Sequence, residues 1–141
     1  MSMQILIDTN IFLDVLLARE PFWEASRQIL TLCEERKIQG FLSASAVTDL
    51  YYIIRRQLHS TERAYTALGF ILDIAGVLPV TGEDVLQAYL LHAADFEDGL
   101  AATCAAANHC DRIITRNTRD FADFAVRACT PEEFLRERAS S

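Results

Sequence analysis

The chain has 141 residues, a length typical of one globular domain. Hydrophobic residues make up 51% and charged residues 23%, a composition that excludes a disordered or fibrous protein. The net charge of −7 argues against a protein that coats nucleic acid through a broad basic face, and leaves room only for a small nucleic-acid site. No apolar run approaches the roughly 20 residues of a membrane span, and the N-terminus lacks the pattern of a secretory signal. We therefore expect a cytoplasmic protein with no membrane contact.

The cysteine spacing argues against both disulfides and a zinc site. No pair has the Cys-x-x-Cys spacing, and no histidine lies at a zinc-finger offset. We expect free, mostly buried thiols in a reducing compartment, at Cys33, Cys104, Cys110 and Cys129.

The first half of the chain predicts two short strands among helices. Residues 3–7 form a continuous apolar run, which is typical of a strand buried on both faces. Three N-cap residue types follow it, and the helical spacing of the next apolar residues predicts a helix that ends before Pro21. The other elements expected in this half are a helix over 22–37, a short strand over 41–43, a helix ending near residue 58 and a helix over 62–75.

The second half repeats the alternation of strand and helix. Thr81 and Asp84 have the spacing of a capping box and predict the start of a helix. Thr130 and Pro131 predict the start of a final short helix. The other elements expected here are a strand edge over 77–80, an alanine-rich helix over 95–107, a strand over 112–115, a single turn over 117–121 and a last strand over 125–127.

This alternation predicts an α/β fold with a mostly parallel central sheet. The chain has no internal repeat, low-complexity tract or linker, so residues 1–138 are expected to form a single domain. Residues 139–141 are expected to be a loose C-terminal tail.

Acidic and amide side chains follow the expected strands or open the next helices: Asp8, Asp49, Asp95, Asp98, Asn117 and Asp120. In a parallel sheet, ligands bind outside the carboxyl ends of the strands. Taken singly, each residue except Asp49 is explained better as a helix cap than as a ligand. Asp49 fits that alternative less well, because it shares a helical face with Tyr52 and Ile53.

Taken together, the four acids Asp8, Asp49, Asp98 and Asp120 predict a metal site at one edge of the sheet. Carboxylates in one cleft raise each other's pKa, and a hard divalent cation removes that cost. Oxygen ligands without His or Cys favour Mg²⁺ or Mn²⁺. Such an ion polarises a phosphoryl oxygen and activates water, which points to phosphodiester hydrolysis.

Four segments in order resemble the PIN-domain ribonucleases, the fold of VapC-type toxins in bacterial toxin–antitoxin modules: residues 5–10, 48–52, 95–102 and 115–121. The resemblance implies a three-layer α/β/α fold and a Mg²⁺- or Mn²⁺-dependent endoribonuclease. It implies Asp8, Asp49, Asp98 and Asp120 as catalytic and metal-binding acids. It also implies an RNA substrate, a homodimer and a small antitoxin protein that blocks the cleft.

Two positions depart from the family pattern. The second acid is usually Glu, and Asp49 is one methylene shorter, so the ion would have to lie closer or bind through a water. Asn117 and Asp120 both fit the fourth position, where we favour Asp120 as the acid and Asn117 as a ligand or a loop-positioning amide.

Several neighbours of these acids have two interpretations. Thr9 and Asn10 either bond the site or cap the helix, and Asp95 is mainly a cap. Thr115 belongs to the segment of the fourth acid, where it could position the site. Four arginines either contact RNA phosphates or form a solvated face: Arg55, Arg56, Arg116 and Arg119.

Two rival functions remain at this point. One is a PIN-fold binding module whose catalysis is weakened at Asp49. The less favoured one is an aspartyl-phosphate phosphatase, because Asn10 stands where its second Asp is expected and no Lys follows the later strands. For the homodimer, the apolar residues after Pro21 and Thr61 could supply the contact surface: Phe22, Trp23, Leu68, Phe70 and Ile71.

Overall fold

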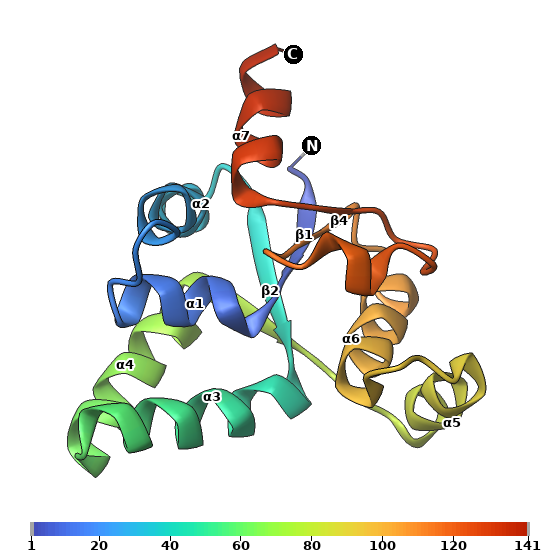
Figure 1. Cartoon of the computed structure of the whole chain (residues 1–141), viewed down its shortest axis with the longest axis horizontal. Helices are drawn as coiled ribbons and strands as arrows, with labels where there is room; N and C mark the ends of the chain where they lie inside the picture. The colour runs from blue at the N-terminus through green and yellow to red at the C-terminus, as the bar shows by residue number, and fades with distance from the viewer. Residues whose placement is uncertain (1, 141) are drawn as a thin grey trace.

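A computed structural model describes residues 2–140 and is built around a five-stranded sheet (Figure 1). The strand order is β3-β2-β1-β4-β5, and every neighbouring pair is parallel. This arrangement confirms the predicted α/β fold and its parallel sheet. The strands are β1 (Gln4–Ile7), β2 (Gln39–Ser43), β3 (Ala75–Leu78), β4 (Arg112–Ile114) and β5 (Ala128–Cys129).

Helices cover both faces of the sheet, as the alternation of strand and helix predicts. They are α1 (Thr9–Leu16), α2 (Trp23–Glu34), α3 (Ala44–Leu58), α4 (Thr61–Ile74), α5 (Gly82–Leu91), α6 (Phe96–Ala107) and α7 (Pro131–Ser140), with the 3₁₀ helix η1 (Thr118–Phe121). None of the helices within residues 2–140 has both the length and the apolar character needed to cross a membrane.

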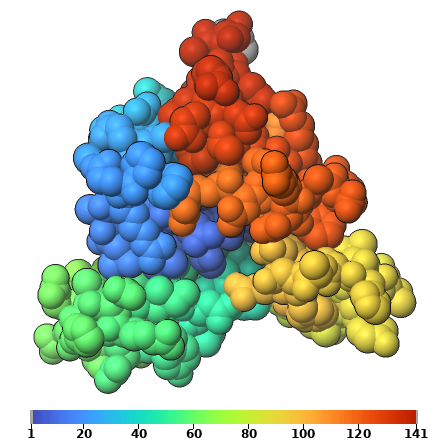
Figure 2. All heavy atoms as spheres, viewed as in Figure 1, coloured from blue at the N-terminus to red at the C-terminus, as the bar shows by residue number. Residues whose placement is uncertain are grey.

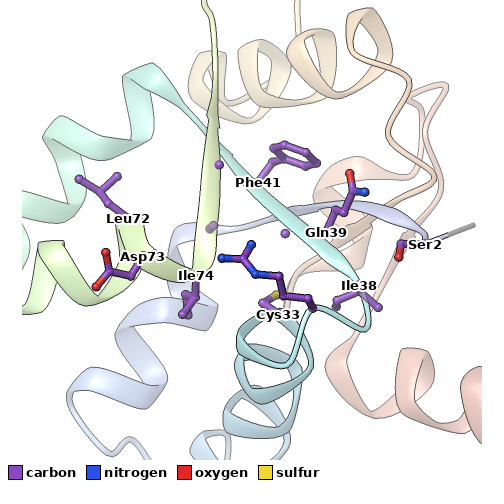
Figure 3. Close-up of a pocket in the computed structure, with 12 residues that line it drawn as sticks. Ser2, Cys33, Ile38, Gln39, Phe41, Leu72, Asp73 and Ile74 are labelled. Atoms are coloured by element: carbon purple, nitrogen blue, oxygen red, sulfur yellow. The ribbon is translucent and has the colours of Figure 1, made fainter.

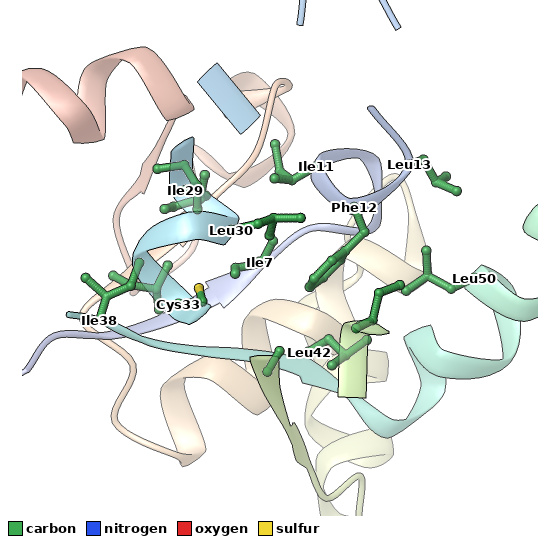
Figure 4. Packing of buried hydrophobic residues seen from close by; sticks show 14 of the residues in the cluster. Ile7, Ile11, Phe12, Leu13, Ile29, Leu30, Cys33, Ile38, Leu42 and Leu50 are labelled. Atoms are coloured by element: carbon green, nitrogen blue, oxygen red, sulfur yellow. The ribbon is translucent and has the colours of Figure 1, made fainter. Parts of the chain in front are cut away.

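The central strand β1 divides the core into two layers. Side chains alternate between the faces of a strand, so Ile5 and Ile7 point to one side and Leu6 to the other. The Ile7 side packs against α1, α2 and α3, where Phe12 is fully buried (Figure 4). The Leu6 side packs against α6 and η1, through Phe121 among others. The three layers α/β/α follow from this alternation.

The element boundaries differ from the expected ones at four places. The helix expected over 22–37 ends at Glu34, where the positive φ of 59° at Arg36 prevents its continuation. Strand β3 begins at Ala75, directly after α4, rather than at residue 77. The last strand is β5 at residues 128–129 rather than 125–127.

The fourth difference is at the C-terminus, where residues 139 and 140 of the expected loose tail belong to the last helix. Helix α7 continues to Ser140, whose hydroxyl donates to the carbonyl of Arg136. Thr130 and Glu133 start this helix as a capping box, and the fully buried Phe134 fixes it to the core. Ser141 lies outside the described residues.

The four cysteines are buried and free, as their spacing predicts. A Cβ atom at Gly40 would lie 2.6 Å from the Cys33 sulfur, so the close packing of β2 on α2 requires glycine there. The same end of β2 borders a hollow that is described with the site below.

Candidate active site

Asp8 follows β1 at the carboxyl end of the sheet, and its backbone N–H donates to the Ile114 carbonyl of β4 at 2.9 Å. It occupies the N-cap position of α1, but its side chain makes no capping hydrogen bond. Its carboxylate instead accepts the Thr115 hydroxyl at 2.7 Å, and the Thr9 hydroxyl lies 3.5 Å away. Burial raises the pKa of Asp8, and the hydrogen bond from Thr115 opposes the rise. Asp8 is thus the N-cap residue of α1 by position, but its side chain bonds Thr115 instead of capping the helix.

Asp8 and Asp98 line one small cavity between β1 and the start of α6. Its volume is about 20 Å³, which is room for about one water molecule or a small ion. Thr9, Ser43 and Glu97 contribute its other polar side chains, and Phe121 contributes to its apolar lining. The first and third predicted acids therefore line the same cavity.

Asp98 experiences the charges of three other acids. Burial raises its pKa to about 6, with further contributions from Asp95, Asp8 and Asp120. Asp120 is exposed on η1, and it is close enough to influence Asp98. Asp95 accepts the backbone N–H of Asp98 at 3.0 Å, which confirms the predicted capping role of Asp95.

Glu97 is the cleft residue that the sequence analysis missed. It lines the cavity, whereas Asp49 is absent from the lining and is hydrogen-bonded to Glu97. Burial, the hydrogen bond with Asp49 and the charges of Asp49, Asp95 and Asp98 together raise the pKa of Glu97 to about 7, with burial the largest cause. The available signal was the run of three acids in four residues at the start of α6, but such acids are ordinary in a first helical turn.

Arg116 pairs with an acid that the sequence analysis also missed. Its Nε lies 2.9 Å from a carboxylate oxygen of Asp14, and its guanidinium lies over the Phe22 ring at 4.1 Å. Asp14 is fully buried on α1, and Arg19 approaches it to 3.9 Å. Burial raises the pKa of Asp14, while the two arginines lower it. Arg116 is thus neither a solvated residue nor a free phosphate ligand, because it anchors its segment to α1.

This anchor holds the segment that supports Asp8. Thr115 precedes Arg116, is fully buried, and donates its hydroxyl to Asp8 while accepting the Asn117 backbone N–H at 3.1 Å. Asn117 caps η1 without a side-chain hydrogen bond, so its amide is not used as a cap. Arg119 is exposed on the same short helix, and Asn10 is half-buried on the first turn of α1.

A larger hollow of about 480 Å³ lies away from the acids, at the start of β2 and beside β3 (Figure 3). Its lining includes Cys33, Phe41 and Asp73 (Figure 3). Because β2 begins there, the hollow is at the amino end of the strands, and ligands of parallel sheets bind at the carboxyl end. The small acidic cavity is therefore the candidate active site.

The donor chemistry of this cavity suits a hard divalent cation. Its polar lining consists of oxygen atoms, and every charged group that acts on Asp98 is another acid. As the side chains stand, no three His, Cys, Asp or Glu residues within residues 2–140 are grouped closely enough to hold a metal ion. The case for a cation thus rests on the acidic charges that act on Asp98 and on the oxygen donors that line the cavity.

A family model described as "PIN domain" matches residues 4–119, so the chain belongs to the PIN-domain family. No curated protein matches it. Among solved structures, VapBC2 from Rickettsia felis bound to a promoter DNA fragment has a TM-score of 0.72 at 16% identity, over 91% of this chain and 98% of that one. A toxin–antitoxin complex from Klebsiella pneumoniae has a TM-score of 0.67 at 22% identity, over 90% and 97%. VapC20 from Mycobacterium tuberculosis, a sarcin-ricin loop cleaving toxin, has a TM-score of 0.66 at 15% identity, over 86% and 96%. These likenesses confirm the fold.

Proposed function

We propose that this protein is a Mg²⁺- or Mn²⁺-dependent endoribonuclease and the toxin of a toxin–antitoxin pair. The observation that carries the proposal is the cavity at the strand ends, which Asp8 and Asp98 line together and where the charges that act on Asp98 are all those of other acids. Membership of the PIN-domain family and the likeness to toxin–antitoxin structures support it. The proposal includes a small antitoxin protein as partner and a cytoplasmic location, which suits four unpaired cysteines.

The acids of the cleft would hold the cation: Asp8, Asp98 and Asp120, with Asp49 or Glu97, and with Asn117 as a further oxygen ligand. When bound, the ion would polarise a phosphoryl oxygen and lower the pKa of an attacking water. Thr115 keeps Asp8 oriented through its hydroxyl. Glu97 would be placed to accept the proton of the water, because it lines the cavity beside Asp98.

In this proposed site, Asp49 would act through its contact with Glu97. Asp49 is hydrogen-bonded to Glu97, which lines the cavity, so Asp49 would help to position the longer side chain. In this arrangement, Glu97 supplies the reach that a glutamate at position 49 would have supplied.

The test is cleavage of unstructured single-stranded RNA by the purified protein with Mg²⁺, with Mn²⁺ and with chelator. We expect cleavage only with a divalent ion, and loss of cleavage in Asp98→Asn. Asp95→Asn is the matched control on the same helix turn, and it should retain more activity because Asp95 caps α6. Equal cleavage in chelator would contradict the metal dependence. An active Asp98→Asn with an inactive Asp95→Asn would contradict the residue assignment.

A second candidate function is a PIN-fold module that binds a partner without catalysis. The observation in its favour is that the carboxylates of the described chain do not stand in a ready ligand cluster. Titration of Mn²⁺ into the protein separates the two functions. The nuclease should bind the ion, with affinity lost in Asp98→Asn, whereas the binding module should show no site-specific binding and no cleavage of several RNAs.

A further inference from the structure

A hollow of about 750 Å³ lies between helices α5 and α6 and the segment that follows η1. Figures 1 and 2 show this region with α5 in yellow and, above it, the segment after β4 in orange. The hollow shares no lining residue with the acidic cavity or with the hollow beside β3. Cavities that bind small molecules have volumes of roughly 300–1,000 Å³. The hollow therefore has room for a ligand of its own, outside the candidate active site.

The floor of this hollow is apolar. Ala102 and Ala106 are four residues apart on α6, so their side chains lie on the same face of the helix. Leu91 of α5 and Phe124, which follows η1, add larger apolar side chains to the lining. Ala106 is exposed and Phe124 is half-buried, so part of this apolar surface is in contact with water. A ligand with an apolar body would remove that surface from water, which is favourable.

The charged groups that line the hollow are all acids. Glu83 and Asp84 belong to the first turn of α5, and Asp123 follows η1. Within residues 2–140 none of these three acids forms an ion pair. Residues 64–111, which carry both helices, contain seven acidic residues and no Lys or Arg. A ligand that complements the hollow must therefore bring positive charge together with apolar surface.

Asp84 distinguishes the hollow from an ordinary solvated acidic surface. It lines the hollow, yet it is only 8% exposed. Its Oδ2 accepts the Thr81 backbone N–H at 3.0 Å, as part of the capping box of α5. Its Oδ1 accepts no hydrogen bond from any other group of residues 2–140. Burying a carboxylate is costly unless it is paired, and an ammonium group would supply both a hydrogen bond and the opposite charge.

We propose that this hollow binds a small organic cation in which an ammonium group is attached to an apolar body such as an aromatic ring. The ammonium group would lie beside Asp84, with the charges of Glu83 and Asp123 around it. The apolar body would cover the alanine floor and contact Phe124, since aromatic rings pack favourably on one another. The three acids would repel an anion, and a purely hydrophilic amine would leave the floor in water.

Titration of the full chain with phenethylamine in chelator, followed by heteronuclear NMR, tests the site. We expect saturable shifts of the amide signals of residues 83–91, 102–107 and 123–125. Phenethyl alcohol keeps the ring without the charge, and ethylamine keeps the charge without the ring. Each should bind at least about tenfold more weakly. Equal binding of either analogue overturns the proposal, as does the absence of saturable phenethylamine binding up to millimolar concentration.

A substitution on the floor tests where the apolar body lies. Ala106→Leu should weaken phenethylamine binding by about tenfold or more, because the larger side chain fills the hollow. Helix content should be unchanged, because Ala106 is exposed and leucine is a good helix former. Ala139→Leu is the matched control at an exposed position of α7, and it should bind like the wild type. Unchanged binding by Ala106→Leu overturns the proposed position.

Removal of charge tests the acids without disturbing the capping box of Asp84. The double variant Glu83→Gln with Asp123→Asn should weaken phenethylamine binding several-fold, because both acids line the hollow. Glu62→Gln with Glu132→Gln removes the same charge at two exposed positions elsewhere, and it should bind like the wild type. Equal losses in the two double variants would show only a response to net charge, which overturns a specific site.

The acidic cavity could attract the same cation, because Phe124 contacts Phe121 of that cavity with ring centroids 5.7 Å apart. Asp98→Asn separates the two sites, and it should bind phenethylamine like the wild type. Loss of binding in Asp98→Asn would place the cation in the acidic cavity and overturn the proposal. A basic peptide that binds the hollow when phenethylamine does not overturns it too. The titration contains neither RNA nor a divalent ion, so its result is separate from the proposed nuclease function.

Discussion

Two buried carboxylates stand six residues apart at the start of the chain and have opposite environments. Asp14 is fully buried, but Arg116 lies 2.9 Å away and Arg19 3.9 Å away, so its charge is balanced inside the protein. Asp8 faces the acidic cavity, where its strongest partner is the neutral hydroxyl of Thr115. Asp14 is thus paired with two arginines inside the fold, whereas Asp8 faces other acids and is influenced by Arg116 only weakly.

The difference separates a structural acid from a functional one. A buried ion pair mainly fixes the arrangement of the elements that carry it, here α1 and the segment after β4. An acid that is buried beside other acids, without a cation, keeps an unfavourable charge in the native protein. This arrangement is retained where function requires it, because a divalent ion can remove the repulsion when it binds.

The largest expected effect is on catalysis in the acidic cavity. Asp8→Asn and Asp98→Asn should each lower RNA cleavage by more than about 100-fold, because even residues that only support metal ligands cost about 10–100-fold when they are replaced. Single-turnover cleavage at saturating Mn²⁺ measures the loss. Asp73→Asn, in the opposite hollow, should cleave like the wild type. Near-normal cleavage by Asp8→Asn would show that the cavity is not the catalytic site.

Asp8 and Asp14 should respond oppositely when the thermal stability of their asparagine variants is measured. Asp14→Asn leaves Arg116 without its partner and should destabilise the fold by about 3 kcal/mol. At roughly 2–4 °C per kcal/mol, the melting temperature should fall by roughly 10 °C. Asp8→Asn in chelator should leave the melting temperature unchanged or raise it, because it removes an unbalanced charge. Thermal unfolding of Asp8→Asn and Asp14→Asn in the same buffer with chelator tests this expectation. Equal decreases of the melting temperature would contradict it.

The three layers of the fold could be predicted because their signals are local. The apolar run at residues 3–7, the capping box at Thr81 and the acid after the first strand are each visible within a few residues of sequence. The two-residue strand β5 was misplaced because it is too short to show a periodicity. Local sequence also says little about where α7 ends, since that depends on the anchoring of Phe134 in the core.

The missed site residues depend on partners that are distant in the sequence. Asp14 looks like a surface acid of an amphipathic helix, and its burial makes sense only with Arg116, about a hundred residues later. Glu97 looks like an ordinary first-turn acid until Asp49 of α3 is seen to be hydrogen-bonded to it. Asp8 could be identified because it directly follows a strand, at the edge where ligands of parallel sheets bind. Asp98 opens a helix that follows another helix, so its identification depended on the resemblance of residues 95–102 to the PIN-domain ribonucleases.

Divalent cations should distinguish the acids of the cleft from the ion-paired Asp14. An ion that binds the folded chain stabilises it by RT ln(1 + [L]/Kd), which is about 2.7 kcal/mol at one hundred times Kd. Saturating Mn²⁺ should therefore raise the melting temperature by several degrees, and Na⁺ at equal ionic strength should not. Asp98→Asn should lose most of this rise. Asp14→Asn should show the full rise, starting from its lower melting temperature. A rise that survives Asp98→Asn would place the ion elsewhere.

The smallest expected effect is a pH dependence of stability in chelator. The folded state raises the pKa of Asp98 from 3.8 to about 6 and that of Glu97 from 4.5 to about 7, so it holds these protons more tightly than the unfolded chain does. Stability is therefore greatest when both groups are protonated, and it falls as the pH rises from about 4 to about 7. Asp98→Asn and Glu97→Gln should each flatten this slope, whereas Asp73→Asn should retain it.

Mn²⁺ should reverse the dependence in the same pH window, because the ion competes with these protons and stabilises the deprotonated cleft. The melting temperature gained from Mn²⁺ should thus grow between about pH 5 and pH 7, a range bracketed by the ordinary and raised pKa values of these acids. Differential scanning fluorimetry on the wild type, Asp98→Asn and Asp73→Asn measures the slope of melting temperature against pH in chelator and in Mn²⁺. Because the other titrating groups are common to these proteins, their contribution cancels when the slopes are subtracted. Identical slopes in the wild type and Asp98→Asn would show that the acids of the cleft do not repel one another, and the distinction between Asp8 and Asp14 would then lose its electrostatic basis.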